Sequence, residues 1–171
     1  MTAAFSSGKG RRAAAALGAV TLGLLTLSAC EKPTPLATAT LGTTTVTTEA
    51  SCYKDGEAIK RSVVEKCLNE KAEHTITVKA GEKVRIGVDP KIADTGWMLT
   101  VNGRAALEEI SDQTYVSLPG AAFFTAPQGA NGPTGPRPKE VQISVIEVHV
   151  EKGKPQEYKG VWHLKLKRDG A

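Results

Sequence analysis

The sequence predicts a mainly β protein, a single antiparallel β-sandwich with one short helix inside a disulfide loop. Apolar and polar residues alternate with a period of two from His74 onward, which is the pattern of half-buried strands. Turn signals rich in Gly, Pro and Asn recur roughly every 8–12 residues, as in sandwiches. The chain has 171 residues, of which 40% are apolar, so it is long enough for one globular domain.

The N-terminus has the organisation of an export signal. Lys9, Arg11 and Arg12 form a positive segment, and residues 13–27 follow without a charge. The segment ends in Leu27-Ser28-Ala29-Cys30. This resembles the lipobox of bacterial lipoproteins and implies cleavage after Ala29, lipidation of Cys30 and retention on the outer face of the cytoplasmic membrane. Arg11-Arg12 alone does not favour twin-arginine export over general secretion.

The expected organisation is therefore a signal peptide over residues 1–29, a lipidated tether over 30–35 and a β-sandwich domain over 36–171. Pro33 and Pro35 favour an extended tether. No apolar stretch beyond residue 30 is long enough for a spanning helix, so the lipid on Cys30 is the expected membrane partner.

Charge argues against nucleic acid as a partner. The whole chain carries a formal charge of +4, with 22 basic and 18 acidic residues. Three of the basic residues precede position 30, where no acidic residue occurs, so the remainder has 19 basic and 18 acidic residues. Its charges alternate in sign and form no basic stripe.

Two cysteines remain when Cys30 carries lipid. Cys52 and Cys67 are exported together into an oxidising space, which predicts a disulfide that encloses 14 residues. A metal pair and a redox dithiol are the alternatives, but the Cys-x-x-Cys spacing of a redox motif is absent. Ser62 and Glu65 have the spacing of a capping box, so we expect a short helix that carries Cys67.

Strands are expected on both sides of this loop. Residues 36–48 predict a Thr-rich edge strand, and residues 74–79 and 82–88 predict a hairpin around Gly81. Asn102-Gly103 is a strong turn signal after a strand over 97–101. Weaker candidates cover 115–118 and 121–125. A long strand follows over 141–150, with a bulge near Val145-Ile146, and a final strand is expected over 162–166.

Two resemblances add to this pattern. The run from Val78 to Ile86 is similar to early hairpins of immunoglobulin-like and cupredoxin-like sandwiches. The lipobox, the loop from Cys52 to Leu68, and the segment Gly96-Trp97 to Asn102-Gly103 together resemble small secreted lipoproteins of Streptomyces-type actinobacteria with no assigned activity. That resemblance implies an outer-surface location and carries over no catalytic residue.

A cupredoxin-like sandwich raises the question of copper. Type 1 copper requires two histidines, a thiolate and often a methionine. His149 and His163 on neighbouring strands, with Met98, are the candidate ligands of a surface metal site. We expect no cofactor, however, because both remaining cysteines are assigned to the disulfide.

The expected function is a non-enzymatic binding or interaction module for an envelope component or another exported protein. The alternative is a metal-handling or electron-transfer protein of the cupredoxin type. No Gly-x-Ser-x-Gly motif or phosphate-binding glycine loop occurs, so no enzyme is predicted.

The candidate partner contact lies in the segment over 123–139. Its glycines and prolines cannot build a core, so the segment must run over the surface, where binding loops occur. Phe123 and Phe124 are taken as consecutive strand residues, which would expose one of them. Arg137 and Lys139 beside them suit an anionic or extended polymer, although a plain hairpin connection is the alternative for the loop over 125–139.

Overall fold

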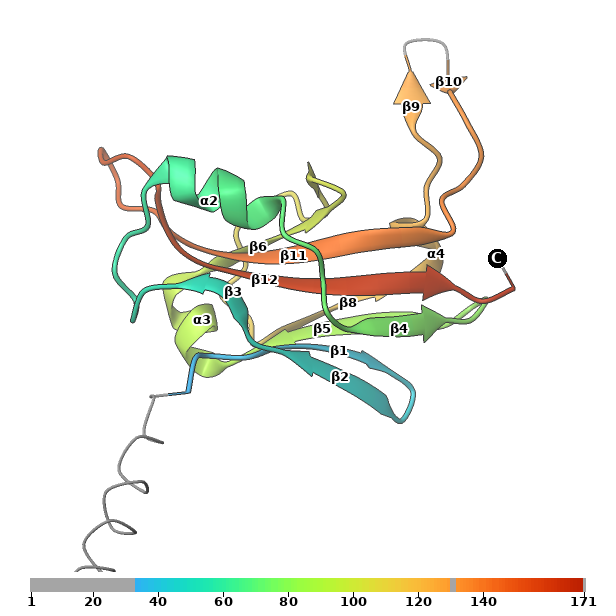
Figure 1. Cartoon of the computed structure of the whole chain (residues 1–171), viewed down its shortest axis with the longest axis horizontal. Coiled ribbons are helices and arrows are strands. Elements are labelled where there is room, and N and C mark those ends of the chain that lie inside the picture. The colour runs from blue at the N-terminus through green and yellow to red at the C-terminus, as the bar shows by residue number, and fades with distance from the viewer. Residues whose placement is uncertain (1–32, 130–131, 171) are drawn as a thin grey trace, which may run out of the picture. The chain divides into compact units, whose positions relative to one another are not determined.

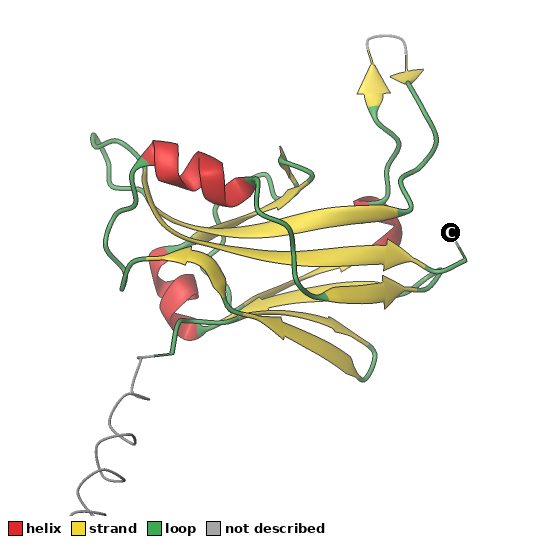
Figure 2. Cartoon of the chain, viewed as in Figure 1, coloured by secondary structure: helices red, strands yellow, loops and turns green. Residues whose placement is uncertain are grey.

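The computed structural model describes residues 33–129 and 132–170. The predicted signal peptide, Cys30 and the first part of the predicted tether lie outside the described residues. From Thr34 onward the chain forms one compact unit. Its elements are mainly strands, arranged as two sheets that face each other across a buried core (Figures 1 and 2).

The first sheet has four antiparallel strands, which lie in the order β2 (Thr44–Thr48), β1 (Ala37–Leu41), β5 (Lys83–Val88) and β8 (Tyr115–Pro119). Ala37, Ala39 and Leu41 of β1 are buried, as the alternation predicted. The Thr-rich run is a hairpin rather than one edge strand. It turns at Gly42, where φ is +54°, so β1 lies inside the sheet and β2 forms its edge.

The second sheet is larger and includes the two longest strands. Its order is β3 (Ala50–Tyr53), β12 (Glu157–Arg168), β11 (Glu140–His149), β6 (Trp97–Val101) and β7 (Arg104–Ala105), and β4 (Thr75–Val78) also pairs with β12. The pairing of β4 with β12 is parallel, whereas the other pairings of this sheet are antiparallel.

The predicted hairpin over residues 74–88 is wrong. β4 belongs to the second sheet and β5 to the first, so the turn at Gly81 carries the chain from one sheet to the other. Alternation alone does not distinguish the two arrangements, because both β4 and β5 bury one face in the same core.

Three helices occur in the described residues: α2 (Arg61–Leu68), α3 (Pro90–Thr95) and α4 (Gly120–Phe123). The predicted disulfide joins Cys52 of β3 to Cys67 of α2. α2 begins one residue before Ser62, with no side-chain cap, so the predicted capping box is wrong. Its buried residues Val64 and Cys67, rather than a cap, hold the helix against the second sheet.

Two cores account for the burial of β11 on both faces. Ile143 and Val145 pack with Trp162 and Leu164 in the core between the sheets. Ile146 and Val148 face outward and pack beneath α2 with Val161 of β12. The predicted bulge is present two residues later than expected, between Glu147 and Val148.

Candidate functional site

The candidate site is a groove of about 440 Å³ that we call the distal groove. It lies where the turn between β6 and β7 faces the base of the hairpin formed by β9 (Gln128–Gly129) and β10 (Gly132–Pro133). The groove is lined by Val101, Asn102, Arg104, Ala105, Ala106, Leu118, Ala122, Phe123, Thr125, Pro127, Pro136 and Pro138.

The Asn102-Gly103 turn builds one wall, as the sequence predicted. Both residues have positive φ, +47° and +78°, which is the geometry that Asn-Gly favours in a tight hairpin. The turn is held against β11 because the Asn102 amide donates to the Gln142 carbonyl at 2.8 Å, and the Gln142 amide donates to Asn102 Oδ1 at 2.9 Å. These bonds fix the backbone from which Arg104 extends.

The proline-rich segment builds the opposite wall. The Pro127 carbonyl accepts hydrogen bonds from the amide (2.8 Å) and the hydroxyl (3.2 Å) of Thr134. A Cβ at Gly129 would lie 2.5 Å from Thr134 Cγ2, so the Thr134 side chain packs closely on the backbone of Gly129. Pro136 and Pro138 have fixed φ angles, and the wall they form loses little conformational entropy on binding.

The floor of the groove contains a one-turn helix, and the prediction that Phe123 and Phe124 lie on a strand with one ring exposed is wrong. Residues 120–123 form the single turn α4 instead of a strand, so Phe123 and Phe124 need not point to opposite sides. Both are buried in the main core, at 2% and 3% exposure. Phe123 contributes to the floor of the groove, but neither ring is an exposed partner contact.

Arg137 and Lys139 are exposed, as expected, but neither lines the distal groove. In the sequence they are neighbours of the lining residues Pro136 and Pro138. Among the lining residues of the described chain, Arg104 is the one with a charged side chain. The sequence analysis did not single out Arg104, although its place after a strong turn signal put it at the surface.

The structure separates the two histidines proposed as metal ligands. His149 is exposed and lies opposite Glu157, whereas His163 lies opposite Ser144, five positions earlier on β11. His163 is only 1% exposed, so a surface site that includes it is wrong. Met98 packs beside the second core.

Both ring nitrogens of His163 are occupied. Nε2 lies 2.8 Å from the Cys67 carbonyl oxygen, which can only accept, so Nε2 donates this hydrogen bond. Nδ1 lies 2.9 Å from Ser144 Oγ and 3.3 Å from Gln142 Nε2. Sequence reasoning expected these two strands to be neighbours but missed the cross-strand pair, because it did not fix their register.

Acidic and thiol groups do not supply a metal site either. In the described part of the chain, Cys52, Cys67 and Glu70 form a cluster of side-chain ligand atoms within 4.8 Å of one another. Both thiols of this cluster are consumed by the disulfide, which leaves a single exposed carboxylate. A metal site would need more donors than this.

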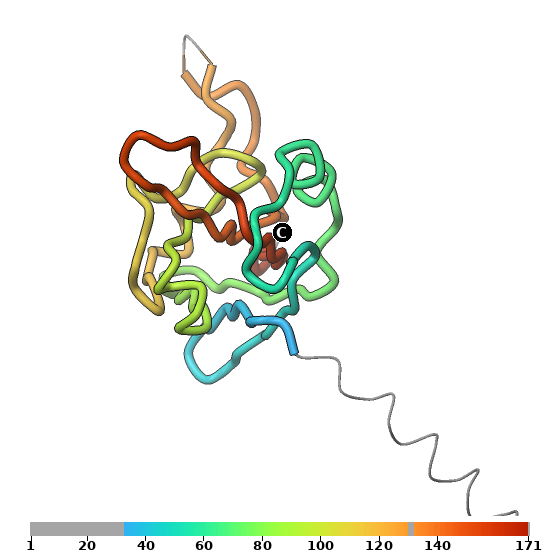
Figure 3. The backbone as a smooth tube through the Cα atoms, turned by 90° about the vertical axis from the view of Figure 1, so that its left-hand side faces the viewer, coloured from blue at the N-terminus to red at the C-terminus, as the bar shows by residue number. Residues whose placement is uncertain are grey.

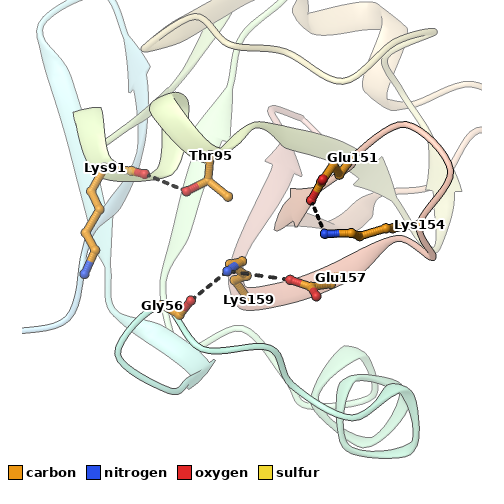
Figure 4. A network of polar contacts seen from close by, with 7 residues as sticks. All are labelled: Gly56, Lys91, Thr95, Glu151, Lys154, Glu157 and Lys159. Atoms are coloured by element: carbon orange, nitrogen blue, oxygen red, sulfur yellow. Dashed lines mark hydrogen bonds and ion pairs between the residues drawn. The ribbon is translucent and has the colours of Figure 1, made fainter.

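A cluster of polar contacts involves Lys159 of β12 and Thr95 of α3 (Figure 4). Lys159 Nζ donates to the Gly56 carbonyl at 2.9 Å and lies 3.8 Å from Glu157 Oε2, and Thr95 Oγ1 donates to the Lys91 carbonyl at 3.1 Å. These contacts tie the loop after β3 to β12 and close the last turn of α3. They are structural links between elements.

Glu147 is buried near this cluster, at 1% exposure, and its Oε2 has no hydrogen-bond partner. Burial raises the pKa of the Glu147 carboxyl, because removal from water disfavours the charged form. Thr95 and the ammonium groups of Lys159 and Lys91 lower that pKa in part. Glu147 is not among the residues that line the distal groove.

No helix within residues 33–129 and 132–170 is long and apolar enough to span a membrane. Comparisons of the chain with protein-family models, with curated proteins and with solved structures find no match.

Proposed function

We propose that this protein is a lipid-anchored binding module on the outer face of the cytoplasmic membrane, and that it holds an extended anionic polymer of the cell envelope in the distal groove. The observation that carries the proposal is the position of the groove. Thr34, where the folded unit begins, and the β9–β10 hairpin lie at opposite ends of the sandwich (Figure 1).

This placement suits an anchored receptor. A lipid on Cys30 would hold the end that contains Thr34 near the bilayer, because only three residues separate the two positions. The distal groove would then point away from the membrane, toward polymers of the envelope. The domain is fixed firmly at its start, since Trp162 Nε1 donates to the Pro35 carbonyl at 2.7 Å in the buried interior.

The lining of the groove suits an extended anionic ligand. Alanine and proline side chains offer a shallow apolar surface, and Arg104 offers a planar cation that can bind phosphate or carboxylate through two parallel hydrogen bonds. Arg137 and Lys139 beside the groove add positive charge along the path of a polymer. Charges at the rim increase the rate of association and favour polyanions over neutral chains.

The same lining supports binding rather than catalysis. Among its residues in the described chain there is no carboxylate, histidine or thiol, so the groove has no general base and no activated nucleophile. The buried Ser144–His163 pair is likewise separate from the groove, and neither residue lines it.

Two experiments test the proposal. Substitution of Cys30 by Ala removes the acceptor thiol, and we expect the protein to leave the membrane fraction. Retention of the Ala variant in that fraction would refute lipid anchoring.

Deletion of residues 129–136 removes the hairpin and the groove residue Pro136. We expect the melting temperature to stay nearly constant, because β9 and β10 pair only with each other, whereas association with isolated envelope is lost.

A further inference from the structure

A second cavity, which we call the proximal pocket, lies at the end of the sandwich where the folded unit begins. It measures about 600 Å³ and follows β3, the edge strand of the second sheet. Figure 3 looks onto this end of the molecule. The pocket is lined by Thr34, Ala50, Ser51, Cys52, Tyr53, Lys54, Ala58, Ile59, Lys60 and Val63.

The lining is apolar inside and basic at the rim. The two charged lining residues, Lys54 and Lys60, are both cationic and both exposed, and no carboxylate of the described chain is among the lining residues. Lys54 also pairs with Glu57 at 2.7 Å, while Lys60 Nζ forms no ion pair within the described chain. Val63 is 42% exposed beside them and adds apolar surface to the lining.

The tether places the pocket close to the bilayer, and this step rests on the proposed lipidation of Cys30. Four peptide units from Cys30 to Thr34 span at most roughly 14 Å. Because Thr34 itself lines the pocket, a lipid on Cys30 would hold this wall of the pocket near the membrane.

We propose that the proximal pocket binds an anionic phospholipid of the anchoring membrane. The acyl chain would lie among the alanines, Ile59 and Val63. The phosphate would lie between Lys54 and Lys60. The lipid would orient the domain so that the distal groove faces away from the membrane.

The test uses the mature chain with the substitution Cys30→Ser, which prevents lipidation. Because the protein is then in solution and the titration measures binding to the proximal pocket, the result depends neither on anchoring nor on the distal groove. The probe is dihexanoylphosphatidylglycerol below its critical micelle concentration, titrated by calorimetry at low salt. We expect saturable binding to one site. The double variant Lys54→Gln/Lys60→Gln should weaken it about 30-fold, as two lysines at an anionic lipid surface would.

Matched variants separate the pocket from general charge. Lys79→Gln/Lys83→Gln removes the same charge from exposed positions at the opposite end and should leave the affinity unchanged. Ala58→Phe places a ring in the cavity from an exposed position and should weaken binding at least tenfold without lowering the melting temperature. Absence of saturable binding, equal binding of glycerol phosphate, or equal binding by the Ala58→Phe protein would each overturn the proposal.

Discussion

The Nε2 atom of His163, in the middle of β12, lies 2.8 Å from the carbonyl oxygen of Cys67, the half-cystine that ends the disulfide loop on α2. Gln142 on the neighbouring strand β11 makes two further hydrogen bonds to the segment after α2. Its side chain accepts from the Ala72 amide at 3.2 Å and donates to the Glu70 carbonyl at 2.8 Å. The segment that leaves α2 is thus fixed to the sheet by side chains as well as by the disulfide.

Replacement of His163 by Leu should therefore destabilise the fold by about 1–3 kcal/mol, because the Cys67 carbonyl and the Ser144 hydroxyl lose a buried partner. Urea unfolding followed by circular dichroism measures the change. His149→Leu is the matched control, since His149 is exposed, and its effect should stay within about 0.5 kcal/mol. Equal effects of the two substitutions would contradict the role assigned to His163.

Removal of the disulfide in the double variant Cys52→Ala/Cys67→Ala should lower the free energy of unfolding by about 3 kcal/mol, because the bridge closes a loop with a sequence separation of 15. α2 should lose most, since an eight-residue helix is marginal by itself. Intact mass of the exported protein after alkylation without reduction provides the direct check. Two alkylated thiols at these positions would show that the bridge does not form.

Gly160→Ala should destabilise the protein by about 1–3 kcal/mol, because a Cβ at this position would overlap the indole ring of Trp162. Trp162 cannot move freely, since its Nε1 is bound to the Pro35 carbonyl and Tyr53 packs 6.0 Å from it, centroid to centroid. Thermal unfolding measures the loss. Gly135→Ala, where the added Cβ meets open space, should leave the melting temperature unchanged. An unchanged melting temperature in Gly160→Ala would show that the ring has room to shift.

Glu147 should make stability depend on pH. Its pKa is raised in the folded state by burial, so the folded protein binds more protons than the unfolded chain between the ordinary carboxyl pKa and the raised value. The contribution of Glu147 to the free energy of unfolding is therefore fully present below the ordinary carboxyl pKa. It is lost as the pH rises from that value through the raised pKa of the folded state. The free energy of unfolding of Glu147→Gln, relative to that of the wild type, should therefore be higher at pH 7 than at pH 4. Paired urea titrations at the two pH values measure this difference. A constant difference between the two proteins at both values would contradict the shift.

Local patterns predicted much of this fold because they report on single strands and turns. The strand Trp97–Val101, the Asn102-Gly103 turn and the long strand Glu140–His149 lie where they were predicted, and the disulfide forms as expected. The final strand is longer than predicted, because it begins at Glu157 rather than at Trp162. A period of two identifies a strand and its buried face. It contains no information on which sheet the strand joins, and this is why the turn at Gly81 was misread as a hairpin.

The candidate site was less accessible to such reasoning. The composition of residues 125–139 located one wall of the distal groove, but Arg104 comes from a distant turn and meets that wall only in the fold. The assignment of Phe123 and Phe124 to a strand failed because a one-turn helix, α4, lets adjacent side chains enter the same core. The pairing of Ser144 with His163 likewise depends on strand register, which neither strand specifies alone.

The most direct test of the proposed function is a binding titration of the non-lipidated mature protein, Cys30→Ser, with polyglycerol phosphate of defined length. We expect saturable, salt-sensitive binding that Arg104→Gln weakens about tenfold, the range of a charge-assisted hydrogen bond to phosphate. Arg61→Gln, an exposed arginine on α2 outside the distal groove, should bind like the wild type. Ala105→Trp should also abolish binding, by filling the groove from an exposed position. Unchanged affinity in both Arg104→Gln and Ala105→Trp would contradict the assignment of the distal groove as the polymer-binding site.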